Sequence, residues 1–143
     1  MSANPAVSTA APPTSKVWNV SLWVIQVALA VMFGIAGVMK TTTPIPQLAE
    51  KLPWVAAVPE GLVRFIGVSE LAGALGLLLP SLTRVQPKLT ALAALGLVVV
   101  MVLASGFHVS RGELSVLPIN FAIGALAGFV AWGRGRKAPI SPR

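Results

Sequence analysis

Residues 61–80 read GLVRFIGVSELAGALGLLLP, and Arg64 and Glu70 are the only charged side chains in this stretch. A helix of about 20 residues is long enough to cross the hydrocarbon layer of a bilayer. Three other runs have a similar length and an apolar composition, namely 20–39, 89–107 and 114–132. The whole chain of 143 residues is 55% hydrophobic and only 10% charged, whereas ordinary soluble domains are about 25% charged. These runs predict an all-α membrane protein, an antiparallel bundle of four transmembrane helices.

Two other interpretations of the apolar runs are disfavoured. A soluble bundle would need a polar face on each helix, and runs 20–39 and 89–107 have none. Run 20–39 is also a poor signal peptide, because it is longer than a usual signal-peptide core and has just Lys16 as a nearby positive charge. We therefore expect the first run to be retained as a membrane helix.

The chain is expected to form one membrane domain between two tails. The domain should span residues 18–133, after a disordered N-terminal tail at 1–17 and before a basic C-terminal tail at 134–143, which is also rich in polar residues and expected to be disordered. Its helices are expected at about 19–40, 61–80, 87–108 and 113–133, and Pro80 is expected to end the second of them. The connection 41–60 is long for so small a bundle. Its QLAEKL segment predicts a short amphipathic helix before a segment at the membrane surface.

Basic residues are distributed unequally between the two ends of such a bundle. One side would carry seven basic residues and no acidic one: Lys16, Arg84, Lys88, Arg134, Arg136, Lys137 and Arg143. The other side would carry four basic and three acidic residues: Lys40, Lys51, Arg64, Arg111, Glu50, Glu60 and Glu113. Because basic residues favour the cytoplasmic side of a membrane, both termini are predicted to be cytoplasmic. The net charge of +7 is then explained by topology and by contact with anionic lipids, and no nucleic acid partner is expected.

Glu70 is the leading candidate for a functional residue. It lies about 13 Å into its helix, where an ionisable side chain costs roughly 2.5–3.5 kcal/mol and should find partners inside the bundle. Helical side chains lean toward the N-terminus of their helix. Glu70 and Asn120 therefore lean outward, Lys40 and His108 lean inward, and the four converge. Together with the shallower Arg64 they predict a polar pocket in the outer half of the bundle, whose side chains bind a ligand or relay protons.

Each of these residues also has a purely structural interpretation. Lys40 and Arg64 can act as anchors at the membrane interface, and His108 can cap its helix. Asn120 can join helices through hydrogen bonds, and Glu70 can belong to an ion pair that fixes the helix register. The sequence leaves open which of Lys40, His108 and Asn120 pairs with Glu70.

Small and polar residues inside the spans indicate where helices pack closely. Glycines at these positions allow backbones to approach one another: Gly34, Gly37, Gly67, Gly73, Gly124 and Gly128. Gln26 lies deep in the first helix and is expected to hydrogen-bond a neighbouring helix.

The amino-acid composition excludes several kinds of redox centre. The chain has no cysteine and a single histidine, so iron–sulfur clusters, cysteine zinc sites and bis-histidine haem are not expected. No metal site is expected, and the protein is not expected to be an enzyme on its own. Redox chemistry, if it occurs here, would depend on a cofactor or on a partner protein.

Three motifs occur in an order that resembles the DoxX-like family of small four-helix bacterial membrane proteins. They are FGIAGVMK at 33–40, RFIGVSELAGALGLLLP at 64–80 followed soon by a basic residue, and ASGFH at 104–108. The resemblance covers about residues 20–132. It implies a four-helix bundle in the bacterial cytoplasmic membrane, with Lys40, Glu70 and His108 at positions typical of the family. The family name derives from a small subunit of thiosulfate:quinone oxidoreductase, and some relatives associate with redox-defence enzymes.

Three functions remain open at this point. The first is a membrane subunit or accessory protein of quinone-linked redox chemistry, with quinone as the ligand and a redox enzyme as the partner. The second is a small proton- or cation-coupled transporter or efflux component that uses Glu70, for which a homo-oligomer is expected. The third is a structural membrane partner without a ligand.

Overall fold

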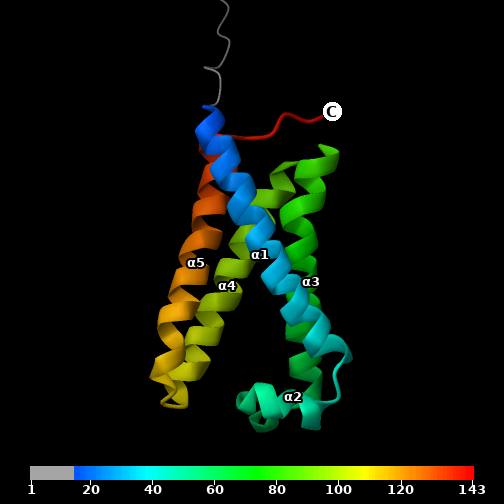
Figure 1. The fold of residues 1–143 in the computed structure, drawn as a ribbon, viewed down its shortest axis with the longest axis vertical. Helices are drawn as coiled ribbons and strands as arrows, with labels where there is room; N and C mark the ends of the chain where they lie inside the picture. The colour runs from blue at the N-terminus through cyan, green and yellow to red at the C-terminus, as the bar shows by residue number, and fades with distance from the viewer. Residues whose placement is uncertain (1–14) are drawn as a thin grey trace, which may run out of the picture.

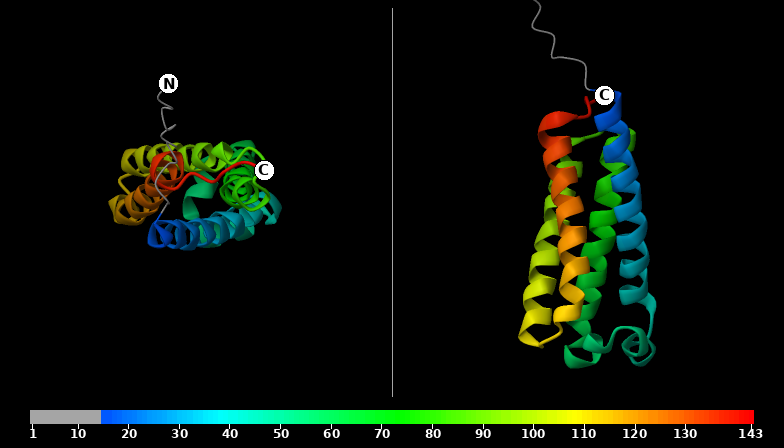
Figure 2. Two further views of the ribbon diagram at one scale, coloured as in Figure 1. Left: turned by 90° about the horizontal axis from the view of Figure 1, so that it is seen from above. Right: turned by 60° about the vertical axis from the view of Figure 1, so that its left-hand side comes forward.

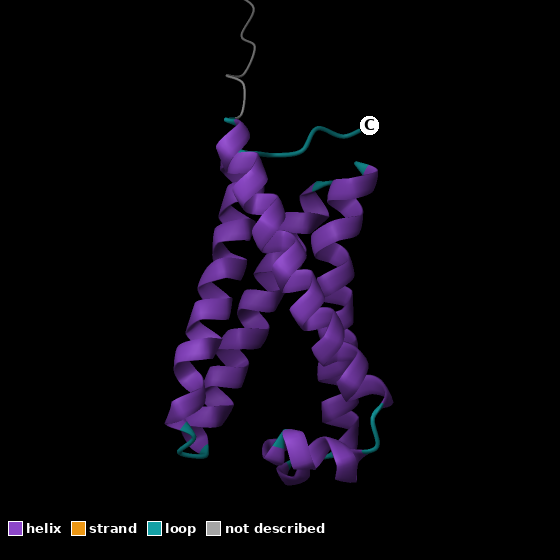
Figure 3. Cartoon of the chain, in the orientation of Figure 1, coloured by secondary structure: helices purple, strands orange, loops and turns teal. Residues whose placement is uncertain are grey.

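The computed structural model describes residues 15–143, and every regular element in that range is helical (Figure 1). The elements in chain order are α1 (Lys16–Thr42), α2 (Ile45–Lys51), η1 (Pro53–Ala57), α3 (Glu60–Thr83), α4 (Lys88–Ser110), η2 (Leu114–Val116), α5 (Leu117–Trp132) and η3 (Gly133–Lys137). The disorder expected for the N-terminal tail concerns residues 1–14 and lies outside the described residues. Figure 3 shows how little of the described chain is loop.

Four helical segments are long and apolar enough to cross a membrane: α1, α3, α4 and the continuous stretch Leu114–Lys137 that contains α5. Successive spans run in opposite directions (Figure 1). The start of α1, the α3–α4 connection and the C-terminus lie at one end of the bundle, called here the tail end. The segment containing α2 and the α4–α5 connection lie at the other, called here the loop end. The expected antiparallel four-helix membrane bundle is therefore confirmed.

The four spans are arranged as two pairs. α1 packs chiefly against α3, α4 packs against α5, and contacts between α3 and α4 join the pairs. The view along the bundle in Figure 2 shows this arrangement, and Figure 1 shows that the pairs diverge toward the loop end. The main core includes large buried apolar side chains from all four spans: Leu22, Leu29, Phe33, Leu77, Leu97, Met101 and Val130. Many large apolar side chains on the outer faces are exposed, as expected for helices surrounded by lipid.

A small second core holds the 43–59 segment at the loop end. Leu48 of α2 and Val55 of η1 are completely buried, together with Val63 of α3. The ring of Trp54 lies 5.9 Å from that of Phe107 on α4, measured between centroids. The short helix expected in this connection is therefore α2, and the following turn reaches across to the second helix pair.

Two expectations about helix ends were wrong. α3 continues through Pro80 to Thr83, and its C-cap residue Arg84 has a left-handed backbone with φ 60°. Pro80 lies in the last turn, where it removes only the hydrogen bond to the carbonyl of Gly76. Residues 134–143 were expected to be a disordered tail, but residues up to Lys137 belong to η3, in which Arg134 is buried. Composition alone suggested disorder, and the hydrogen bonds of Arg134 described below explain the additional turn.

Candidate functional site: a buried ion pair between two helices

Two glycines bring the backbones of α1 and α3 together in the loop half of the bundle. A methyl group placed on Gly37 would lie 2.7 Å from Leu71 Cγ and 2.8 Å from the carbonyl oxygen of Gly67. A methyl group on Gly67 would lie 2.8 Å from Lys40 Cβ. Ordinary side chains do not fit at such separations, so glycine is needed on both helices. Each glycine precedes a charged residue by three positions, which places glycine and charge on the same helix face.

The charged residues on these faces form a buried ion pair. Lys40 Nζ lies 2.7 Å from Glu70 Oε1 and 2.7 Å from Glu70 Oε2, so one ammonium group donates to both carboxylate oxygens. Only 9% of the Lys40 side chain and 5% of the Glu70 side chain are exposed. Lys40 is in the last turn of α1, and its side chain leans back into the bundle as helix geometry requires. Sequence reasoning placed Lys40 and Glu70 together, and the structure selects Lys40 as the partner.

Arg64 connects this region to the surface of the loop end. Its Nη1 donates hydrogen bonds to the backbone carbonyls of Lys40, at 2.7 Å, and Thr43, at 2.8 Å. Its Nε and Nη2 donate to Glu60 Oε1 at 3.1 and 2.9 Å. The two carbonyls lie at the C-terminus of α1, where few backbone donors remain to satisfy them. Arg64 therefore fixes the end of α1 to α3, while its other face pairs with Glu60, whose side chain is 63% exposed.

His108 takes part in a separate cluster. Its Nδ1 lies 2.6 Å from Glu113 Oε2, and Arg111 Nε donates to Glu113 Oε1 at 2.8 Å. Hydrogen bonds from His108 and then Arg111 lower the pKa of Glu113 below its usual value. Among residues 15–143 no hydrogen bond or ion pair joins this cluster to Lys40 or Glu70. The structure thus brings Lys40, Arg64 and Glu70 into one network and gives His108 a different carboxylate.

Asn120 is buried in α5, close to Pro118 in the first turn of that helix. Its Nδ2 has no hydrogen-bond partner within the described part of the chain. An amide donor without a partner is costly in a low-dielectric interior. Asn120 therefore remains a candidate ligand contact on the second helix pair, without a contact to the ion pair itself.

The sequence did not reveal a polar network at the tail end. Arg134 Nε donates to Gln26 Oε1 at 2.5 Å, and Arg134 Nη1 donates to Asn19 Oδ1 at 2.7 Å. Gln26 Nε2 donates to the carbonyl of Leu77 at 2.7 Å, so Gln26 joins α1 to α3 as expected. A structural role for Arg134 was hard to predict, because an arginine just after a membrane span usually serves only to orient the span in the membrane. The one feature of the sequence that pointed to this network was Gln26, a polar residue deep in α1 that needs a hydrogen-bond partner on another helix.

The other predicted packing glycines differ in how tightly they are enclosed. A methyl group on Gly73 would lie 2.5 Å from Leu97 Cδ2, so a side chain at this position would require Leu97 of α4 to move. At Gly34, Gly124 and Gly128 the nearest side-chain atoms are 3.9, 3.4 and 3.9 Å away, which is ordinary van der Waals contact. Gly124 and Gly128 therefore do not form a close backbone contact within one chain.

Residues 15–143 contain no group of three or more His, Asp or Glu side chains that could hold a metal ion. The Lys40–Glu70 pair itself offers an ammonium donor and a carboxylate acceptor. Such a pair can bind a polar group or exchange protons in a region from which water is largely excluded.

Comparisons with known proteins agree with this architecture. The family model described as the DoxX-like family matches residues 24–130, which include most of α1, all of α3 and α4, and most of α5. Searches of curated proteins and of solved structures find no match. The matched range contains the glycine contact, the Lys40–Glu70 pair and the His108–Glu113 pair. The chain is an integral membrane protein and belongs to the DoxX-like family.

Proposed function

We propose that this protein is a membrane subunit or accessory protein of quinone-linked redox chemistry. In this proposal the Lys40–Glu70 pair receives the head group of a quinone from the bilayer and exchanges protons with it. The observation that supports the proposal is the pair itself, an ammonium and a carboxylate 2.7 Å apart and nearly buried between two membrane helices. An ionisable pair at such depth is costly, and in membrane proteins it commonly marks a ligand or proton pathway.

The pair offers the hydrogen-bonding groups that a quinone requires. The Lys40 ammonium can donate to a quinone carbonyl oxygen, and the Glu70 carboxylate can accept from a quinol hydroxyl. Reduction of a quinone to a quinol takes up two electrons and two protons. A partner dehydrogenase supplies the electrons, Lys40 supplies one proton to a carbonyl oxygen, and water at the loop end supplies the second and reprotonates Lys40.

The surroundings of the pair suit a ligand that arrives from the lipid phase. Exposed apolar side chains occur on both helices near the pair, including Val38 on α1 and Phe65 and Val68 on α3. A lipophilic molecule can therefore approach this level of the bundle without crossing a charged surface. Asn120, whose amide donor has no partner in residues 15–143, is a candidate for a second polar contact.

A second candidate function is proton- or cation-coupled transport. Glu60, Arg64 and the backbone carbonyl of Lys40 form a hydrogen-bonded series from the exposed surface of the loop end to the backbone of the residue whose side chain pairs with Glu70. This polar region gives water a way to approach the level of the pair from the loop end, which a coupled transporter would need. In this function Glu70 would be the coupling carboxylate.

We also propose that both termini are on the cytoplasmic side of a bacterial cytoplasmic membrane. The excess of basic residues at the tail end supports this orientation, since cytoplasmic loops are enriched in Lys and Arg. The loop end, with the ion pair in its half of the bundle, would then face outward. Attachment of a reporter to residue 143 and accessibility labelling at the exposed Lys51 would test this orientation.

The experiment that tests the function uses the full chain in nanodiscs. Quinone binding is measured by mass spectrometry of the purified protein and by titration with a short-chain quinone. We expect Glu70→Gln and Lys40→Met to weaken quinone binding. The control Glu60→Gln also removes a carboxylate from an ion pair, but from the exposed pair with Arg64, and should leave quinone binding unchanged. Binding that is unaffected by Glu70→Gln would refute the quinone proposal. Proton flux in liposomes that depends on Glu70 would favour transport instead.

A structural role is distinguished by the double variant Lys40→Met/Glu70→Met. If the pair only stabilises the fold, this variant should retain stability and also any activity measured with a partner. If the pair acts on a ligand, the double variant should fold but lose quinone binding. Retained binding in the folded double variant would overturn the proposed function.

A further inference from the structure

Arg134 is a buried cation without a carboxylate partner. It is 5% exposed, and its hydrogen bonds go to neutral acceptors: Gln26 Oε1, Asn19 Oδ1 and the carbonyl of Ala138. Its Nη2 has no partner within residues 15–143. Buried charges in proteins are normally neutralised by an opposite charge.

No acidic side chain supplies that charge at the tail end. Its acidic side chains number four, and all lie in the loop half of the bundle: Glu50, Glu60, Glu70 and Glu113. The ion pairs of the described residues are likewise confined to the loop half. An anion from outside the chain is therefore the natural counter-charge for the tail end.

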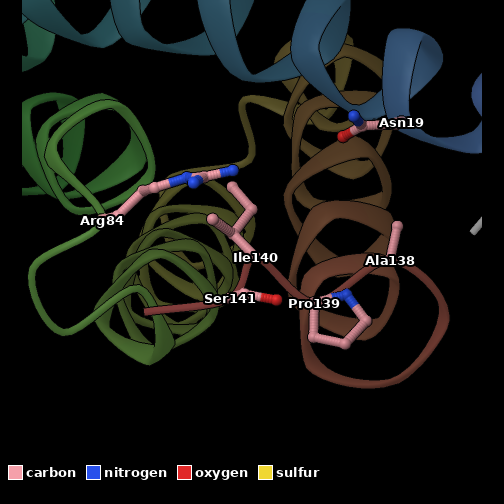
Figure 4. Close-up of a pocket in the computed structure, with 6 residues that line it drawn as sticks. All are labelled: Asn19, Arg84, Ala138, Pro139, Ile140 and Ser141. Carbon is pink, nitrogen blue, oxygen red and sulfur yellow. The ribbon is translucent and has the colours of Figure 1, made fainter. Parts of the chain in front are cut away.

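A cavity at the tail end lies next to this arginine. Its volume is about 160 Å³, and it is lined by Asn19, Arg84, Ala138, Pro139, Ile140 and Ser141. Asn19 and Ala138 are also the residues that accept hydrogen bonds from Arg134 Nη1. In Figure 4 the polar ends of Arg84, Asn19 and Ser141 surround a common space. Arg84 thus lines the cavity directly, and the buried Arg134 contacts two of the other residues that line it.

Two backbone hydrogen bonds hold the C-terminal segment as a wall of this cavity. Ala138 N donates to the carbonyl of Gly133 at 2.8 Å, and Arg143 N donates to the carbonyl of Arg84 at 3.2 Å. The second bond joins the end of the chain to the left-handed residue that terminates α3. Residues 138–141 are therefore positioned across the tail end between α1 and the α3–α4 connection.

We propose that this cavity binds a phosphate group, from either a phospholipid head group or a soluble phosphate. The guanidinium of Arg84 can donate two parallel hydrogen bonds to phosphate oxygens. The Asn19 amide and the Ser141 hydroxyl add neutral donors. No acidic side chain lies near enough to repel an anion, and Arg134 contributes a second positive charge from behind Asn19.

The test compares two variants at the same end of the bundle. Arg84→Gln removes the cation that lines the cavity, and Arg136→Gln removes an exposed cation that does not line it. Arg84 is exposed, and glutamine, like arginine, carries a Cβ at the left-handed position, so the variant is expected to fold. The full chain is placed in nanodiscs of phosphatidylcholine alone or with phosphatidylglycerol. Native mass spectrometry then counts retained phosphatidylglycerol, and inorganic phosphate is titrated in the phosphatidylcholine discs while the melting temperature is followed.

We expect one saturable site, with affinity reduced at least about tenfold by Arg84→Gln and unchanged by Arg136→Gln. Retention of one phosphatidylglycerol per chain identifies a lipid head group as the source. A saturable rise in melting temperature with inorganic phosphate identifies a soluble one. Equal losses in both variants would indicate diffuse attraction and overturn the proposal, as would the absence of saturable binding of either probe.

Discussion

Replacing Lys40 alone and replacing Glu70 alone should lower the free energy of unfolding by unequal amounts. Removing one partner of a buried ion pair typically costs about 3–5 kcal/mol, because an uncompensated charge is left behind. Lys40→Met leaves the Glu70 carboxylate stranded near the middle of α3, with a short side chain that cannot reach water. We expect this variant to lose about 3–5 kcal/mol of the free energy of unfolding.

Glu70→Met should cost less, about 1–2 kcal/mol, because the long Lys40 side chain can turn toward the interface. Lys40 occupies the last turn of α1, two residues before the helix ends at Thr42. Its ammonium can therefore reach the loop end with a change of rotamer. The double variant should lie within about 1 kcal/mol of the wild type, since an apolar pair of similar volume replaces two charges.

The free energies are measured by titrating the protein in mixed micelles with a denaturing detergent and following helix content. Glu60→Gln is the matched control, because its exposed pair with Arg64 should contribute under about 1 kcal/mol. The cost of Lys40→Met should also shrink as the pH is lowered, because protonation neutralises the stranded carboxylate. Equal costs for the two single variants, or a double variant less stable than both, would refute this reasoning.

Three further predictions concern other parts of the bundle. Gly67→Val should reduce thermal stability sharply, because its side chain would collide with α1, whereas Gly96→Ala, with no atom within 4 Å, should be neutral or stabilising. The stabilisation from the lowered pKa of Glu113 should be present above the usual carboxyl pKa and disappear as the pH falls through the lowered value, so wild type and Glu113→Gln should then melt alike. Gln26→Leu should cost about 1–3 kcal/mol in the detergent titration by leaving Arg134 Nε without an acceptor; a fully stable variant would contradict that.

The general architecture was predictable because it depends on composition over long windows. Four apolar runs of membrane-spanning length predict four spans, and no local detail can change that result. The exact ends were less predictable. α3 passes Pro80 because a proline in the last turn removes little, and α5 continues into η3 because Arg134 finds acceptors on α1. The first outcome depends on where the proline lies within the turn, and the second depends on a tertiary contact that a single helix does not encode.

The candidate site was predictable in part for the same reason. Depth singled out Glu70, and the lean of helical side chains brought Lys40 to a similar level, but depth alone left three candidate partners. The choice depends on which helices touch and in what register, and that is determined by the close contact of Gly37 with Gly67. The repeated spacing of glycine and charge, three residues apart on each helix, was the available signal.

His108 was predicted in the pocket because its side chain was expected to lean inward from the end of its helix, whereas in the structure it pairs with Glu113. The two residues are five positions apart across the end of α4, and the turn at Gly112, with φ 73°, folds the chain back so that they meet. A positive φ at glycine is hard to anticipate from a short polar loop. Because His108 pairs with Glu113, it is not the partner of Glu70, which pairs with Lys40.

The distribution of carboxylates gives the two halves of the bundle different dependences on solution conditions. In the loop half, Glu60, Glu70 and Glu113 each pair with a basic side chain of the same half. Its stability should therefore respond to pH and to loss of a partner. The tail half has basic side chains, including the buried Arg134, and no acidic ones. Its stability should instead respond to the anions supplied by the membrane or the solution, so that a change from neutral to anionic lipid affects one end of the molecule and acidification affects the other.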